Sequence, residues 1–174
     1  MSESMDEYSE SLEGEFRKVE AALLSDTVKL LAPSEPIRLT PEATVQDAVA
    51  KMVADRRAAV VIVDAEGRLI GIFTERDVLT RVVTQGRDAQ RTRLGEVMTP
   101  DQEALSPDDR ISYAINRMTN AGYRMVPLVD ADRRPVGIVT VNDVAKWLAE
   151  TFPEAVLNVR PGDKIKNPLQ VDSG

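Results

Sequence analysis

One segment of this chain occurs twice, and the two copies lie 66 residues apart. The sequence Gly-Ile-Phe-Thr-Glu-Arg-Asp-Val at residues 71–78 returns as Gly-Ile-Val-Thr-Val-Asn-Asp-Val at residues 137–144. The same offset holds without a gap from Leu39 and its counterpart Leu105 through to these segments. A registered repeat of that length indicates a duplicated structural unit.

Composition narrows the classes of function open to the chain. With 174 residues, 43% of them apolar, it is large enough to bury a core. It contains no Cys and no His, so the usual general base and thiolate or imidazole metal ligands are missing. The net charge of −7 argues against nonspecific nucleic-acid binding. No run reaches the roughly 20 apolar residues of a membrane helix, and the first residues are acidic, so we expect a cytoplasmic protein.

The first 32 residues precede the repeat and predict an amphipathic helix. Apolar residues recur there at helical spacings, and Pro33 and Pro36 end the pattern. Because this stripe covers only about two to three heptads, we expect the helix to pack on its own domain rather than to form a coiled coil. The apolar residues are Leu12, Phe16, Val19, Leu23 and Leu30.

Each copy of the repeat shows the same order of apolar patterns, which predicts an α+β unit of the form β-α-β-β-α. The predicted strands are 36–40, 60–63 and 69–73 in the first copy, and 104–106, 126–129 and 136–139 in the second. The predicted apolar face of the first helix is Val45, Ala48, Val49, Met52 and Val53, matched by Ile111, Ala114, Ile115 and Met118. The second helix of each unit is marked by Val78, Leu79 and Val82, or by Val144, Trp147 and Leu148.

These patterns divide the chain into five predicted segments. A helix is followed by the first unit, a polar and basic linker, the second unit and a C-terminal arm whose last three residues we expect to be disordered. Within the arm, Val156–Val159 is predicted to be a strand or an extended stretch. The segments are 1–32, 33–84, 85–95, 96–151 and 152–174.

The repeated Thr and Asp stand where a strand ends and a helix begins, which suits a phosphate and ribose site. Thr74 and Thr140 place a hydroxyl beside the N–H groups of a helix start, which attract anions. Asp77 and Asp143 lie almost one turn later, where a carboxylate can accept hydrogen bonds from a vicinal diol. The Gly three residues before each Thr leaves room for a flat ring or a second backbone. The same Thr-to-Asp spacing also describes a capping box that only starts a helix, and the pattern leaves both interpretations open.

With these motifs the chain resembles a tandem pair of cystathionine β-synthase (CBS) domains, a Bateman module, over about residues 33–150. The resemblance rests on the paired segments 71–77 and 137–143, on Arg124-Met125-Val126-Pro127-Leu128-Val129-Asp130, and on Glu96-Val97-Met98-Thr99-Pro100. It implies two pseudo-symmetric units packed sheet to sheet, with two clefts that bind adenosine compounds such as AMP, ADP, ATP or S-adenosylmethionine. It also implies a sensor without a required cofactor, and a homodimer formed through helical faces.

The resemblance further implies which residues form each cleft. Each cleft would take its Thr, Asp and adenine-facing strand from one unit, and the segment that leads into the first strand, the lead-in segment, from the other. The first cleft would combine Arg57, Ala59, Val60, Thr74 and Asp77 with Thr99 and Pro100, and the second would combine Tyr123, Arg124, Met125, Val126, Thr140 and Asp143 with residues 33–37.

The two clefts differ in sequence. Arg124 is placed to reach a phosphate, whereas its counterpart in the first unit is Ala58. Arg57 or Arg76 would be the source of charge in the first cleft, although each is more simply explained as an exposed surface arginine. Trp147 stands on the apolar side of a helix and is assigned to packing or to a dimer face.

Three hypotheses of function follow. The first is a stand-alone regulatory module that binds an adenosine-type nucleotide and signals to a partner protein, without nucleic acid or membrane. The second is a dimerising scaffold whose clefts stay empty and whose Thr and Asp only cap helices. The third, a Mg²⁺-dependent nucleotide hydrolase, is disfavoured because the chain has no His or Cys, no P-loop and no dinucleotide Gly motif.

Overall fold

The computed structural model describes residues 3–153, so the predicted Val156–Val159 segment and the rest of the C-terminal arm lie outside the described residues. Along the chain the elements are α1 (Glu3–Ser25), η1 (Val28–Leu31), β1 (Arg38–Leu39), α2 (Val45–Asp55), β2 (Ala59–Val63), β3 (Leu69–Thr74), α3 (Glu75–Asp77), η2 (Val78–Val83), α4 (Leu94–Val97), β4 (Thr99–Pro100), α5 (Ile111–Asn120), β5 (Met125–Val129), β6 (Pro135–Thr140) and α6 (Val141–Thr151). Of the two η elements, η1 is a 3₁₀ turn and η2 is a single stretch of π-helix.

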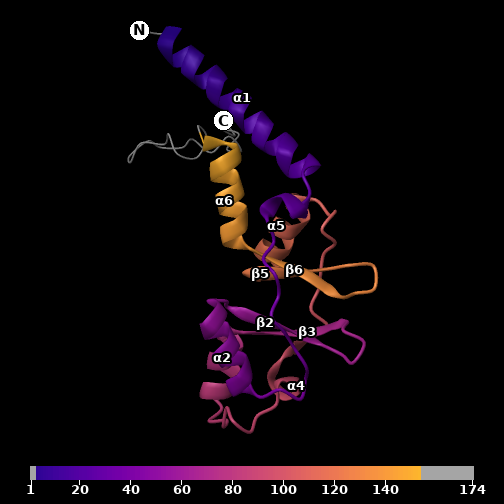
Figure 1. Ribbon diagram of the computed structural model, residues 1–174. Coiled ribbons are helices and arrows are strands. Elements are labelled where there is room, and N and C mark those ends of the chain that lie inside the picture. The colour runs from indigo at the N-terminus through magenta and orange to yellow at the C-terminus, as the bar shows by residue number, and fades with distance from the viewer. Residues whose placement is uncertain (1–2, 154–174) are drawn as a thin grey trace.

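Two sheets carry the repeated units (Figure 1). In the first sheet the strand order is β1-β2-β3-β4, with β1 parallel to β2 and the other neighbours antiparallel. The second sheet consists of the antiparallel pair β5-β6, flanked by single bridges from Leu105 to Leu128 and from Ser34 to Ile138. The predicted first strands are therefore short, because one is two residues long and the other is reduced to the bridge at Leu105.

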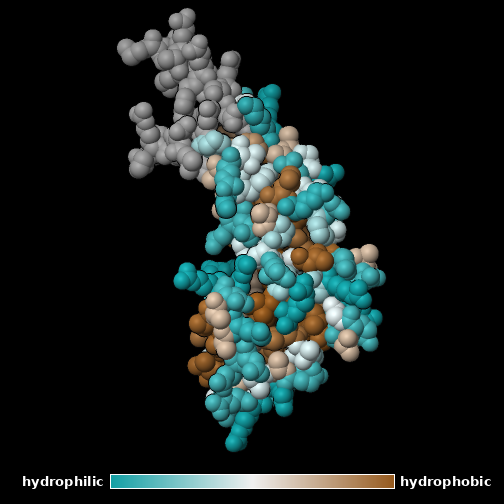
Figure 2. Space-filling view, viewed as in Figure 1, coloured by the Kyte–Doolittle hydropathy of each residue, from teal (hydrophilic) through white to brown (hydrophobic). Residues whose placement is uncertain are grey.

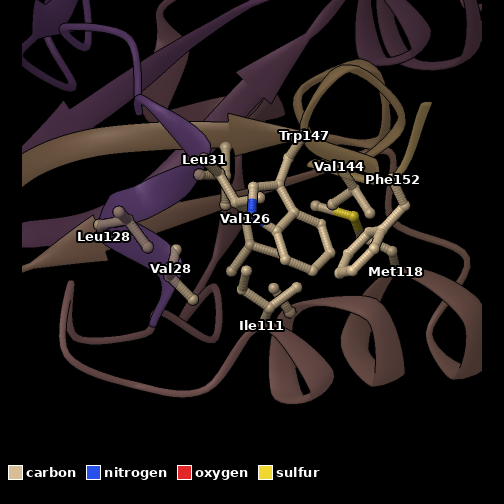
Figure 3. Close-up of a cluster of buried hydrophobic side chains, with 11 residues drawn as sticks. Val28, Leu31, Ile111, Met118, Val126, Leu128, Val144, Trp147 and Phe152 are labelled. Atoms are coloured by element: carbon tan, nitrogen blue, oxygen red, sulfur yellow. The ribbon is translucent and has the colours of Figure 1, made fainter. Parts of the chain in front are cut away.

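Each sheet packs its helices on one face and thereby encloses a core. In the first unit Val45, Ala48 and Met52 of α2 are buried against the sheet, as the helical spacing predicts. Val53 is an exception to that prediction: it is 73% exposed, because it lies one residue beyond Met52, where the surface of the helix turns to solvent. In the second unit Trp147 packs edge to face against Phe152, with ring centroids 5.7 Å apart (Figure 3), so Trp147 has the predicted packing role.

The two units exchange the short helices that precede their first strands. Val28 and Leu31 of η1, which leads into the first unit, are buried in the core of the second unit. Leu94 and Val97 of α4, which leads into the second unit, are buried in the core of the first. Because η1 and α4 are also 66 residues apart, the repeat extends back to residue 28. The boundaries drawn from the sequence near residues 32 and 95 therefore run through segments that cross between units.

A third cluster of apolar side chains joins the faces of the two sheets. Val61 and Leu69 of the first unit meet Ile138 of the second, and all three are buried. A hydrogen bond also links the two units at this boundary, where Arg38 Nη2 donates to the Pro135 carbonyl oxygen at 2.9 Å. The chain therefore has the predicted α+β fold of two pseudo-symmetric units packed sheet to sheet.

The N-terminal helix differs from its predicted extent. It ends at Ser25 instead of continuing to about residue 30, because the next residues bond to the loop before α5; the Asp26 carbonyl, for example, accepts the Ile111 N–H at 3.0 Å. Leu30, predicted within the apolar stripe, is 55% exposed. Figure 1 shows α1 at the end of the molecule formed by the second unit, and three of its residues, Val19, Ala22 and Leu23, pack on that unit's core. Among the helices within residues 3–153, none combines the length and apolarity that a bilayer crossing requires.

Candidate functional site

The Thr and Asp of the first repeated motif form a reciprocal cap at the start of α3. The Asp77 Oδ2 atom accepts the Thr74 N–H at 2.9 Å and the Thr74 hydroxyl at 2.7 Å. In return the Asp77 N–H donates to Thr74 Oγ1 at 3.3 Å. Asp77 is buried, whereas Thr74 is half-buried, so the hydroxyl edge of this pair is the part that can be reached.

The second motif repeats this geometry at the start of α6. Asp143 Oδ2 accepts hydrogen bonds from the Thr140 N–H at 2.7 Å and from the Thr140 hydroxyl at 2.8 Å. The Asp143 N–H in turn donates to Thr140 Oγ1 at 3.3 Å. Both side chains are half-buried. The two motifs are thus equivalent at the level of the cap, as the sequence repeat predicts.

A third capping box shows that this geometry alone does not define a binding site. Thr44 and Asp47 make the same three bonds at the start of α2, at 2.9, 2.7 and 3.1 Å. Hydrogen bonds from the Thr44 hydroxyl and N–H hold the pKa of Asp47 below its ordinary value. Position distinguishes the repeated motifs, since each stands at the end of a strand that is bordered by the other unit.

The lead-in segments supply that border. The pair Thr99 and Pro100, which leads into the first strand of the second unit, is antiparallel to β3, opposite Ile72 and Gly71. Symmetrically, Ser34 exchanges two backbone hydrogen bonds with Ile138 of β6, at 3.0 and 2.9 Å. Each strand that ends in the repeated Thr is therefore flanked by a lead-in segment of the other unit.

Other predicted site residues are brought to the same strand ends. Ala59 lies opposite Thr74 across β2 and β3, and Met125 lies opposite Thr140 across β5 and β6. The Val60 and Val126 side chains, in contrast, are buried in the cores between sheet and helices. Only main-chain atoms of these two valines can face a ligand.

The predicted charged and aromatic residues are less enclosed. Arg124 is exposed, and its carbonyl accepts the Val141 N–H at 3.1 Å, which holds it next to the start of α6. Arg57 is also exposed and borders a surface hollow of about 590 Å³ between α2 and η2. Tyr123 and Thr99 are half-buried, and Pro100 is exposed.

Arg81, which follows the first motif on η2, is a candidate site residue that was not predicted from the sequence. Its Nε atom lies 3.3 Å from Asp77 Oδ1, the carboxylate oxygen that the cap does not use. Its Nη1 atom donates to the backbone carbonyls of Val97, at 3.0 Å, and of Met98. The spacing of an Asp and an Arg four residues apart on a helix was the available signal.

A larger hollow, of about 660 Å³, lies beside the β2–β3 turn and the segment 101–105, and includes Arg117 and Arg133. None of the predicted site residues lines it. Within residues 3–153, no three acidic side chains come together in a way that would hold a metal ion.

The fold and these strand ends define a class of protein: a duplicated α+β module in which two units share the borders of two equivalent sites. The CBS domain family matches residues 29–84 and 94–150, and the chain belongs to that family. Pairs of CBS domains are typically regulatory ligand-binding modules rather than catalysts.

Known proteins agree with this assignment. The CBS domain-containing protein CBSX3, mitochondrial, of Arabidopsis thaliana is 30% identical over 142 residues, which cover 78% of this chain and 68% of that one. Among solved structures, the CBS domain pair of protein MJ0100 in complex with 5′-methylthioadenosine and S-adenosyl-L-methionine is 26% identical, with a TM-score of 0.65 over 72% of this chain and 97% of that one. The CBS-domain containing protein ATU1752 from Agrobacterium tumefaciens is 28% identical, with a TM-score of 0.59 over 65% and 89%.

Proposed function

We propose that this protein is a regulatory module that binds an adenosine-type ligand, AMP, ADP, ATP or S-adenosylmethionine, in the clefts between its two CBS units. The observation that carries the proposal is the exchange of lead-in segments around the two motifs. Thr74 with Asp77, and Thr140 with Asp143, each stand at a strand end flanked by the other unit. The adenosine ligands held by the CBS pair of MJ0100 support the ligand class.

The residues have distinct roles in this proposal. The N–H groups of the helix starts meet a phosphate or another polar group of the ligand, with Arg124 as a cation for the second cleft. Each Thr hydroxyl donates its proton to the Asp and keeps one acceptor position for a hydroxyl of the ligand. The Asp carboxylates accept hydrogen bonds from the ribose, because each cap leaves Oδ1 unused. Ala59 and Met125 present the strand edges for the base, together with the segments around Thr99 and residues 33–37.

Signalling follows from where the ligand contacts the chain. A ligand bound in either cleft would touch both units, so it would stabilise one relative arrangement of the two. It can shift that equilibrium only by the difference between its affinities for the two arrangements. A partner protein that recognises one arrangement would then read the binding state. The cytoplasm remains the predicted compartment.

The decisive experiment is a calorimetric titration of nucleotide-stripped protein with AMP, ADP, ATP, S-adenosylmethionine and NADH. We expect micromolar binding that falls by about tenfold or more in Asp77→Ala, in Asp143→Ala or in both, because a hydrogen bond to a charged group is lost. The matched control is Asp47→Ala, which removes the same capping box away from the clefts and should keep the affinity while lowering the stability of α2.

The second candidate function is a dimerising scaffold with empty clefts. The identical cap at Thr44 and Asp47 favours it, since a helix start alone accounts for the Thr-to-Asp bonds. No heat with any of the five ligands, together with no nucleotide released on denaturing the purified protein, would establish this alternative over the sensor.

A further inference from the structure

Arg81 pairs a cation with the Asp of the first motif, and the Asp of the second motif has no such partner among residues 3–153. It is paired with Asp77, whose side chain is only 11% exposed, at 3.3 Å. The residue at the same position of the second repeat is Trp147, which is buried next to Phe152. Within residues 3–153, no cation forms an ion pair with Asp143. The two motifs therefore differ at the carboxylate that would meet a ribose.

Arg81 is fixed from a second side by α4. The last carbonyls of a helix have no partner within the helix, and basic side chains commonly satisfy them. Here the Arg81 Nη1 atom donates to the carbonyls of Val97, at 3.0 Å, and of Met98. The guanidinium is thus held on one side by the end of α4 and on the other by Asp77. These contacts fix its position more firmly than a single ion pair at the surface would.

A count of acceptor positions shows what this pairing changes. A carboxylate offers about four hydrogen-bond positions, two on each oxygen. In both motifs the cap occupies two positions on Oδ2. Asp143 retains both positions on Oδ1, whereas the Arg81 guanidinium, with its Nε atom in an ion pair 3.3 Å from Asp77 Oδ1, fills the space on one side of that oxygen. Asp143 can accept two hydroxyl groups, and Asp77 can accept only one while Arg81 stays in place.

We propose that Arg81 is a specificity-determining residue that makes the first cleft bind its ligand through one ribose hydroxyl, while the second cleft binds through both. This inference rests on the proposed function, because it concerns the same two clefts. The two clefts would therefore differ in how well they tolerate a ligand that lacks one ribose hydroxyl. Removal of the 2′- or of the 3′-hydroxyl costs the second cleft a charge-assisted hydrogen bond, a loss of roughly tenfold to a hundredfold in affinity, whereas one of the two removals costs the first cleft little.

The test measures each cleft by itself. In Asp143→Ala protein the first cleft is titrated with AMP, 2′-deoxy-AMP and 3′-deoxy-AMP, and in Asp77→Ala protein the second cleft is titrated with the same three ligands; ATP and its two deoxy forms are the second probe. Each deoxy ligand gives a ratio of its dissociation constant to that of the parent nucleotide, and we expect the smaller of the two ratios to be about 1–3 in Asp143→Ala and about tenfold or more in Asp77→Ala. Adding Arg81→Met to Asp143→Ala should raise the smaller ratio of the first cleft to about tenfold.

Arg87→Met in the same Asp143→Ala background is the matched control. Arg87 also bonds to α4, through Glu96 at 3.5 Å, and its side chain is 41% exposed like that of Arg81. It makes no contact with Asp77, so its loss should leave the ratio unchanged. Should Arg81→Met fail to fold by circular dichroism, Arg81→Gln removes the charge and keeps a donor for the α4 carbonyls.

The outcomes separate the two proposals. A smaller ratio that is already tenfold in Asp143→Ala, or that does not respond to Arg81→Met, overturns the role of Arg81 while leaving nucleotide binding established. Absence of binding by the wild-type protein and by every variant overturns the proposed function, and the assignment of Arg81 with it. Binding to the first cleft that appears only after Arg81→Met also overturns the proposed role, because Arg81 would then exclude the ligand instead of limiting it to one hydroxyl.

Discussion

Gly71 and Gly137 lie where a lead-in segment of the other unit comes closest to each sheet. A Cβ atom on Gly71 would be 2.9 Å from the Thr99 carbonyl oxygen and 2.7 Å from Met98 Sδ. A Cβ atom on Gly137 would be 2.9 Å from the Pro33 Cβ atom. Of the two uses predicted for these glycines, a flat ring or a second backbone, the structure shows the neighbouring chain segment in that space.

Gly71→Ala should therefore destabilise the protein by about 1–3 kcal/mol, because the β4 backbone has to move away. Thermal and urea unfolding followed by circular dichroism measure this change. Gly14→Ala is the control, since its added Cβ meets nothing within 4 Å and Ala favours a helix more than Gly does. Equal stability of Gly71→Ala and wild type would mean that β4 can move away from β3 at little cost, contrary to the close contact at Gly71.

At the residue scale, the sequence predicted the motifs but not their surroundings. Thr74 and Asp77 could be found because duplication repeats them at a fixed offset. Arg81 could not be found by that comparison, because its counterpart is Trp147 and the repeat is broken there. Val60 was assigned to the cleft by family resemblance, whereas its side chain is buried in the core.

At the scale of elements, the order β-α-β-β-α was readable because each strand and helix has its own local period. The exchange of η1 and α4 between the units could not be predicted in this way, since contacts between distant segments leave no local pattern in the sequence. Val28 and Leu31 also sit three residues apart, a spacing that merges with the apolar stripe of α1. Only the packing on the second unit's core separates η1 from α1.

The β2–β3 turn is an element whose stability should depend on pH. Asp64 Oδ1 accepts the N–H groups of Arg68 and Glu66, at 2.8 and 3.1 Å, and Oδ2 accepts Arg68 Nε at 2.8 Å. The Arg68 N–H, more than the Arg68 side chain, holds the pKa of Asp64 below its ordinary value. Because the unfolded chain then binds the proton more tightly, this carboxylate stabilises the fold above about pH 3.9, and its contribution is lost as pH falls through the lowered pKa.

Asp64→Asn should accordingly lower the melting temperature at pH 7, and its difference from wild type should shrink as the pH is lowered toward about 3. Melting temperatures recorded by circular dichroism across that range test this. Glu66→Gln removes only the exposed pair with Arg68, at 3.0 Å, and should show a smaller effect at pH 7. A difference between Asp64→Asn and wild type that is the same at every pH would contradict the assignment.

At the scale of the whole molecule, the two units expose unequal helical faces. Val53, Leu79 and Val83 of the first unit are 73%, 61% and 64% exposed, and Figure 2 shows hydrophobic side chains gathered on the edge that carries α2. Their counterparts in the second repeat are Thr119, Ala145 and Ala149, which are smaller or polar. An apolar patch of this kind is typical of a protein interface. We propose that this face of the first unit forms a homodimer.

Leu79→Glu should dissociate that dimer. In a two-fold interface each substitution occurs twice, so two unpaired carboxylates would be buried, and we expect the dimer dissociation constant to rise by at least about 100-fold. Size-exclusion chromatography with light scattering at several concentrations measures it. Val141→Glu, at a 47% exposed position of the second unit, is the matched control and should remain dimeric. A dimer that survives Leu79→Glu but not Val141→Glu would move the interface to the second unit, and a wild-type monomer at all concentrations would refute the dimer.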